Sequence, residues 1–157
     1  MKLNGKTIGL CINIPPRERW ASGVDFSLAL QDFSSYFAGL LFKSGGKLVM
    51  NRHAGLSPIC KRQADRLTSG EVLEFSLSPA DEKIDLLVMV GCSFSPDEIE
   101  QIRKAKHRGI PVQLVGACVA EVSAVWRDCG DERFFLVPDP SAEVGNLLIA
   151  LGKRLAQ

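Results

Sequence analysis

The sequence predicts a three-layer α/β/α domain built on a mostly parallel β-sheet. Short apolar runs alternate with stretches of helical periodicity along the whole chain, which is typical of strand–helix–strand units. One apolar run, residues 86–90, is rich in Val and Leu and stops at Gly91, as expected for a strand that is buried on both faces. Ser95, Pro96 and Glu98 then form a helix-start pattern, because Ser is a preferred N-cap and Ser-x-x-Glu is a capping box.

The composition indicates one globular domain that covers residues 1–157. Apolar residues make up 46% of the chain and charged residues 24%, and the formal net charge of +1 gives no reason to expect DNA, RNA or a membrane surface as a partner. No apolar stretch approaches the roughly 18 residues of a membrane span, and no signal peptide is predicted. Because the five cysteines form no CxxC pair and the two histidines lie far apart, we expect buried thiols in a reducing cytoplasm, without a metal or cofactor.

The first half of the chain is expected to supply three strands and two helices. Strands are predicted over residues 6–14, 47–50 and 72–75. A long helix begins near Asp25, carries apolar residues at helical spacing, and ends at the glycines 45 and 46. A basic helix is expected over residues 59–67, and residues 76–83 are expected to form a loop.

The second half begins with the buried strand and continues the alternation. A charged helix is predicted over residues 96–107, followed by strands and helices at residues 110–115, 119–126, 133–137 and 141–155. Ser141 is expected to cap the last helix. No internal repeat or linker divides the chain, which supports a single domain.

Small, basic or aromatic residues follow each of the four main strands. Because parallel strands end at the same edge of a sheet, these residues are expected to meet at one crevice. Arginine and the free N–H groups of a helix start suit phosphate, Trp suits a base, and a carboxylate suits a sugar or general-base role. A capping box, a solvated arginine and an ordinary loop remain open as explanations without a ligand. The candidates are Arg17 and Trp20, Arg52 and His53, Gly91 with Ser95 and the potentially catalytic Glu98, and Gly116.

The turn GCSFSPDE resembles the GGxGTxxE signature of the lonely-guy phosphoribohydrolases, also called lysine decarboxylase-like proteins. Gly91 and Glu98 match that signature, and Ser95 stands at the position of its threonine. Cys92 and Phe94 replace two of its glycines. The resemblance therefore keeps the acidic residue and departs from the glycine-rich phosphate turn.

Two other segments resemble the wider SLOG superfamily, the nucleotide-sensing relatives of those enzymes. Residues 47–59 are similar to its GGHPxxxP turn, with matches at His53 and Pro58. Residues 110–126 are similar to its strand, small-residue turn and helix that ends in Trp. The resemblance implies a Rossmann-like sheet that binds a nucleotide or nucleotide derivative across the carboxyl ends of its strands.

Three functions are compatible with this resemblance. The first is a SLOG-type domain that binds or senses a nucleotide with little or no catalysis, because Phe94 replaces a glycine of the phosphate turn. The second is a nucleotide N-glycosidase, in which Glu98 assists at the ribose and Arg52 or Arg17 holds the phosphate. The third is a ligand-free protein-interaction module. The resemblance also implies a homodimer, for which the long aromatic first helix is a candidate surface.

Overall fold

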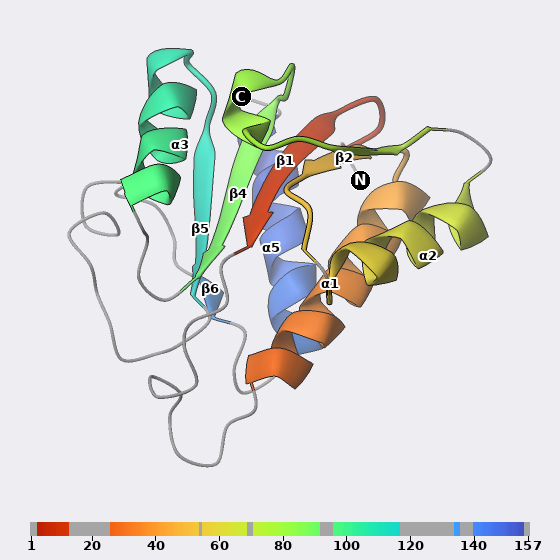
Figure 1. The fold of residues 1–157 in the computed structure, drawn as a ribbon. Helices are drawn as coiled ribbons and strands as arrows, with labels where there is room; N and C mark the ends of the chain where they lie inside the picture. The colour runs from red at the N-terminus through yellow and green to blue at the C-terminus, as the bar shows by residue number, and fades with distance from the viewer. Residues whose placement is uncertain are drawn as a thin grey trace.

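The computed structural model describes residues 3–12, 26–53, 55–68, 71–91, 96–116, 134–135 and 140–155 (Figure 1). At its centre is a six-stranded sheet with the order β3-β2-β1-β4-β5-β6, in which every neighbouring pair is parallel. This confirms the predicted α/β class and makes the fold Rossmann-like. The strands are β1 (Thr7–Ile12), β2 (Lys47–Met50), β3 (Leu73–Phe75), β4 (Leu86–Gly91), β5 (Val112–Gly116) and β6 (Phe134–Phe135).

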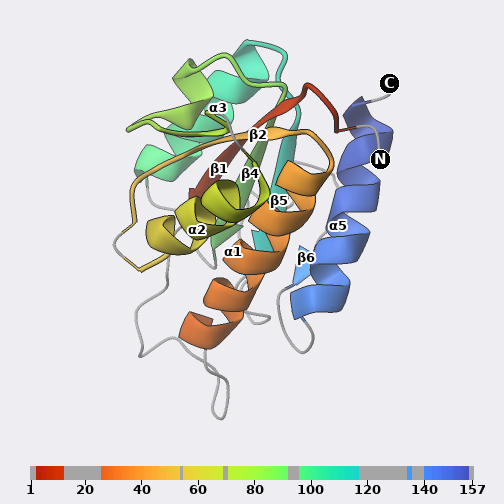
Figure 2. The ribbon, with the colours of Figure 1, turned by 90° about the vertical axis from the view of Figure 1, so that its right-hand side faces the viewer.

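Helices cover both faces of the sheet and complete three layers (Figures 1 and 2). One face carries α1 (Phe26–Lys43), α2 (Ser57–Leu67) and α5 (Pro140–Leu155), with α1 between the other two. The other face carries α3 (Pro96–His107) and the short 3₁₀-helix η2 (Pro79–Asp81). Strands are added from β1 toward one edge of the sheet and from β4 toward the other edge. Because crossovers between parallel strands are right-handed, connections that run in opposite directions lie on opposite faces.

Successive side chains of the central strands point to opposite faces of the sheet, which divides the apolar core into two parts. Val88 and Val90 of β4 belong to the cluster beneath α1, α2 and α5, whereas Leu87 and Met89 belong to the cluster beneath α3. All four side chains are almost completely buried. This is why β4 has a continuous apolar sequence, as predicted for a strand buried on both faces.

Most predicted elements are confirmed, with small differences at their ends. The strand at residues 47–50 and the helix at residues 96–107 have the predicted bounds. The helix predicted from residue 59 starts two residues earlier, at Ser57, because Pro58 fits its first turn. The last helix starts at Pro140, so Ser141 lies inside its first turn and does not cap it. Residues 13–14 and the helix predicted over residues 119–126 lie outside the described residues.

Among the described helices, none combines the length and the apolar character that crossing a lipid bilayer requires.

Candidate functional site

The order in which successive strands are added to the sheet changes direction between β1 and β4. β1 is followed by strands on one side of the sheet, whereas β4 leads to strands on the other. At the carboxyl ends, Ile12 pairs with Val90 and Gly91 pairs with Gly116. In open parallel sheets such a reversal leaves a crevice beyond the strand ends, because the outgoing connections diverge. Gly91 and Gly116, two of the predicted site residues, are direct neighbours at the point where such a crevice is expected. As glycines, they have no side chain to obstruct an approaching ligand.

Glu98 lies in the first turn of α3, which covers one face of the sheet and starts at its carboxyl end (Figure 1). Burial raises the pKa of the Cys11 thiol to about 12, and the negative charge of Glu98 adds to this rise. Cys11 is the penultimate residue of β1. The charge of Glu98 is therefore near enough to Cys11 to act on its thiol.

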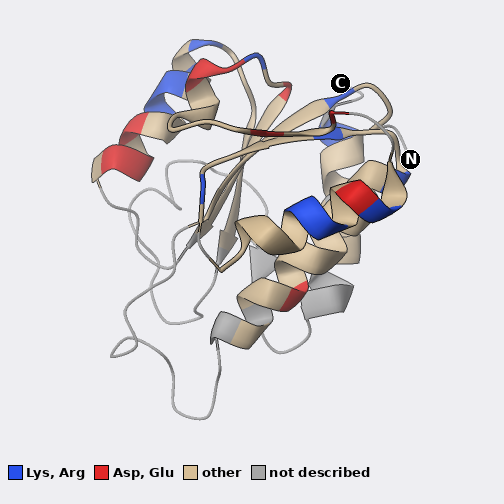
Figure 3. Cartoon of the chain, turned by 45° about the vertical axis from the view of Figure 1, so that its right-hand side comes forward, with Lys and Arg blue, Asp and Glu red and all other residues tan. Residues whose placement is uncertain are grey.

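The start of α3 is acidic. Asp97 and Glu98 lie in its first turn (Figure 3). Lys104, Lys106 and His107 occupy the last turn. This distribution complements the helix dipole, whose positive end is at the amino terminus. The two carboxylates repel a phosphate at this helix start, whereas ligand hydroxyl groups can donate hydrogen bonds to a carboxylate.

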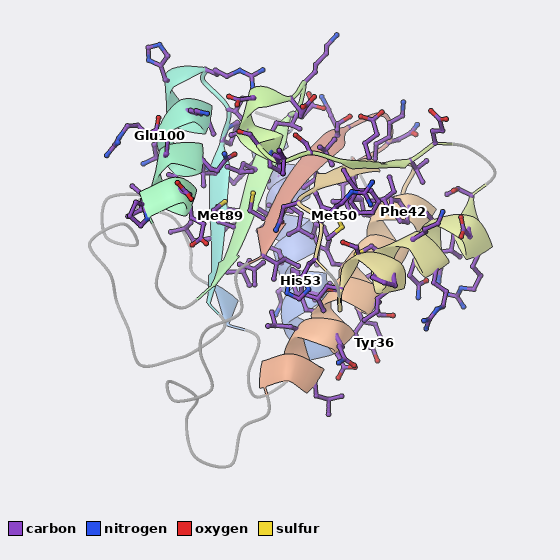
Figure 4. All side chains as sticks on the ribbon, in the orientation of Figure 1. Tyr36, Phe42, Met50, His53, Met89 and Glu100 are labelled. Atoms are coloured by element: carbon purple, nitrogen blue, oxygen red, sulfur yellow. The ribbon has the colours of Figure 1, made fainter. Side chains whose placement is uncertain are left out.

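The turn between β2 and α2 is organised around His53, which lies at the end of the sheet toward which the strands point (Figure 4). Its N–H donates to Ser57 Oγ at 2.7 Å, and its carbonyl accepts from the N–H of Ser57 at 2.9 Å. The N–H of Gly55 donates to His53 Nδ1 at 3.2 Å. In the neutral imidazole the proton is therefore on Nε2, which is a hydrogen-bond donor.

Arg52 stacks on an aromatic ring at the edge of the sheet. Its guanidinium carbon lies 4.4 Å from the centre of the Phe75 ring, at the end of β3. This cation–π contact places the charge of Arg52 beside β3, which is separated from β1 by β2.

Asn51 and Cys11 also contribute to this edge, and the role of Cys11 was not predicted from the sequence. Asn51 follows β2 directly, and its Oδ1 accepts a hydrogen bond from the N–H of Ile12 at 3.2 Å. Cys11 faces the α3 side of the sheet, near Glu98. The alternation of side chains along β1 indicates which face of the sheet Cys11 occupies. That Cys11 lies near Glu98 depends on the strand order, which places β4 and α3 beside β1. The other predicted site residues, Arg17, Trp20 and Ser95, lie outside the described residues, so their placement stays a prediction.

A separate pocket of about 210 Å³ lies at the opposite, amino-terminal rim of the sheet. Thr7 and Lys47, the first residues of β1 and β2, line it together with the acidic residues Glu71, Glu74 and Glu82. Its charged side chains are exposed. Within the described ranges, no group of three or more His, Cys, Asp or Glu side chains is placed to hold a metal ion.

No protein-family model, curated protein or solved structure matches this chain. The fold is Rossmann-like on the basis of its own strand order and parallel pairing.

Proposed function

We propose that the crevice at the carboxyl ends of β1 and β4 binds a nucleotide or a nucleotide derivative, as in a SLOG-type sensing domain, with little or no catalysis. The reversal of strand order at β1 and β4 carries this proposal, because ligands of open parallel α/β sheets bind at that point. The neighbouring Gly91 and Gly116 support it, since a ligand can approach the backbone there.

The charges at the crevice suggest how the ligand is oriented. Glu98 accepts hydrogen bonds from the ribose hydroxyl groups, because a carboxylate is an acceptor for hydroxyl donors. The phosphate is directed away from Asp97 and Glu98, and His53 donates from Nε2. Arg17 and Trp20, which lie outside the described residues, stay candidates from the sequence for contacts with the phosphate and the base.

A thermal-shift screen tests binding. Nucleoside monophosphates, cyclic nucleotides and ADP-ribose are each added at millimolar concentration. A ligand at 100 times its Kd stabilises the folded state by about 2.7 kcal/mol, or roughly 5–10 °C for a domain of this size. Gly116→Val should reduce the shift, because it adds a branched side chain at the strand end where the ligand is proposed to bind. Gly145→Ala in α5, where an added methyl group meets nothing within 4 Å, should leave it unchanged. A screen without any shift would contradict the proposal.

The alternative activity is hydrolysis of the N-glycosidic bond of a nucleotide. The position of Glu98 near the end of β1 favours it, because a carboxylate there can activate the water that replaces the base at the ribose. Release of free base from nucleoside monophosphates, separated by chromatography, measures this reaction. Glu98→Gln should abolish release while preserving the thermal shift. Release that continues at the wild-type rate in this variant would remove Glu98 from the mechanism.

We also propose that the protein functions in the cytoplasm. Cys11 and Cys60 are free and buried, which fits a reducing compartment.

A further inference from the structure

A pocket of about 190 Å³ opens between the second halves of α1 and α2, which pack against each other on one face of the sheet (Figure 2). Because α1 ends at Lys43, shortly before β2 starts at Lys47, this pocket lies toward the amino-terminal end of the strands. The crevice proposed for the nucleotide lies at their carboxyl ends. The pocket is therefore a candidate site of its own.

Gln63 of α2 lines the pocket, and both helices hold its side chain. Its Nε2 donates to Ser35 Oγ of α1 at 3.1 Å, and its Oε1 accepts from Arg66 Nη2 at 2.8 Å. Gly39 of α1 leaves room for it, because a Cβ at that position would lie only 3.4 Å from Gln63 Oε1. The Gln63 amide therefore fixes the Ser35 hydroxyl and the Arg66 guanidinium at the edge of the pocket.

The polar groups that this arrangement offers to a ligand are mainly donors. Ser35 Oγ accepts from Gln63, so its own O–H can donate to a ligand. Arg66 gives one N–H to Gln63 and has further N–H groups, and Lys43 adds an ammonium group. The described lining includes no Asp or Glu. A pocket of this kind suits an anion.

Lys43 and Arg66 supply the positive charge of the pocket. Both side chains are exposed, and within the described ranges neither belongs to an ion pair. Each lies in the last turn of its helix, where a cation also complements the helix dipole. Carbonyl groups at these two helix ends already accept from the N–H and hydroxyl groups of Ser44 and Thr68. The two cations are therefore available to a ligand.

We propose that this pocket binds a phosphate monoester of a small, partly apolar molecule. Such a phosphate carries a charge of about −1.5 to −2 at pH 7, which matches two cations better than a single carboxylate does. The planar guanidinium of Arg66 binds two phosphate oxygens, and Lys43 and Ser35 donate to the phosphate as well. The apolar part of the molecule lies against Leu40 and the ring of Tyr36. Benzene fits cavities of about 150 Å³, so an aromatic ring has the right size.

A nuclear magnetic resonance titration of the ¹⁵N-labelled full chain with phenyl phosphate, at constant ionic strength, tests the proposal. We expect saturable shifts at the amides of Ser35, Gly39 and Gln63. Phenol has the same ring without the phosphate and should leave these amides unchanged. The proposal is overturned if phenyl phosphate causes no shift at these amides, if phenol shifts them equally, or if the shifts are confined to Gly91 and Gly116.

Charge-removing variants make the test specific to the pocket. Lys43→Gln and Arg66→Gln should each raise the Kd for phenyl phosphate roughly fivefold or more, because each removes a charged donor. Arg62→Gln is the matched control, since it removes the same charge from an exposed position of α2 that does not line the pocket. Circular dichroism establishes that each variant is folded. Equal effects of Arg66→Gln and Arg62→Gln would overturn the proposal, because the attraction would then not depend on the pocket.

This inference does not depend on the proposed nucleotide site. The amides of Gly91 and Gly116 report on the crevice, and those of Ser35 and Gly39 report on the pocket between α1 and α2. The failure of one proposal is therefore visible without the failure of the other.

Discussion

The amide oxygen of Asn51, directly after β2, accepts a hydrogen bond from the N–H of Ile12 at the end of β1, at 3.2 Å. This contact joins two strand ends beside the crevice. Asn51→Ala should lower the free energy of unfolding by about 1 kcal/mol, because the Ile12 N–H loses its acceptor. Asn51→Asp retains the oxygen and should keep most of this stability. Urea denaturation measures both variants, and an equal loss in the two would contradict the role assigned to the oxygen.

The thiols of Cys11 and Cys60 give stability a pH dependence in the alkaline range. Burial, aided at Cys11 by the charge of Glu98, raises the pKa of each thiol from 9.0 to about 12. Above pH 9 the unfolded chain loses these protons while the folded chain retains them. The free energy of unfolding should therefore fall between pH 9 and 12, by at most about 1.4 kcal/mol per pH unit for each thiol.

Comparison with a double variant isolates this effect from the titration of lysine and tyrosine. Cys11→Ala combined with Cys60→Ala removes both thiols, so its stability should decrease less steeply above pH 9. Urea denaturation at several pH values up to 11 provides the slopes. The interpretation fails if the two proteins have the same slope.

At the scale of secondary-structure elements, one side of α3 holds the segment around η2. Gln101 Nε2 donates to Ser78 Oγ at 2.7 Å, and Gln101 Oε1 accepts from the buried Ala80 N–H at 3.0 Å. Lys104 pairs with Asp81 at 3.1 Å, and Arg108 donates to the carbonyls of Ala80 and Glu82. These contacts attach the crossover between β3 and β4 to the face of the sheet.

Gln101→Ala should therefore lower the free energy of unfolding by about 1–2 kcal/mol, because it leaves the buried N–H of Ala80 without an acceptor. Arg103→Ala is the matched control on the same helix. Among the described residues, the partner of Arg103 is Glu100, in an exposed pair, so its loss should change stability by no more than about 0.5 kcal/mol. Urea denaturation compares the two variants, and similar losses would argue against the anchoring role.

The first and last residues of α3 and β2 are predicted correctly from the sequence, because residues within or beside each element mark its ends. Pro96 and the acidic first turn mark the start of α3, and an apolar run bounded by Gly46 marks β2. In contrast, η2 lies in a stretch that was predicted as a loop. Its conformation depends on Gln101 and Arg108, which are distant in sequence, so no local pattern indicates it.

At the scale of the whole molecule, the alternation of elements predicts a parallel sheet but not the order of its strands. Any parallel sheet places the residues after its strands at one edge, which is why Gly91 and Gly116 could be identified as candidates. Their direct pairing, and the reversal at β1 and β4, follow only from the order. The same holds for Arg52, whose stacking on Phe75 requires β3 beside β2.

The proposal that a nucleotide binds beyond β1 and β4 is tested most directly by nuclear magnetic resonance. The ¹⁵N-labelled protein is titrated with AMP and with ADP-ribose to millimolar concentration. The account predicts saturable shifts at the amides of Ile12, Gly91 and Gly116, with Thr7 and Lys47 at the opposite rim unaffected. Spectra unchanged by both ligands, or shifts confined to Thr7 and Lys47, would contradict it.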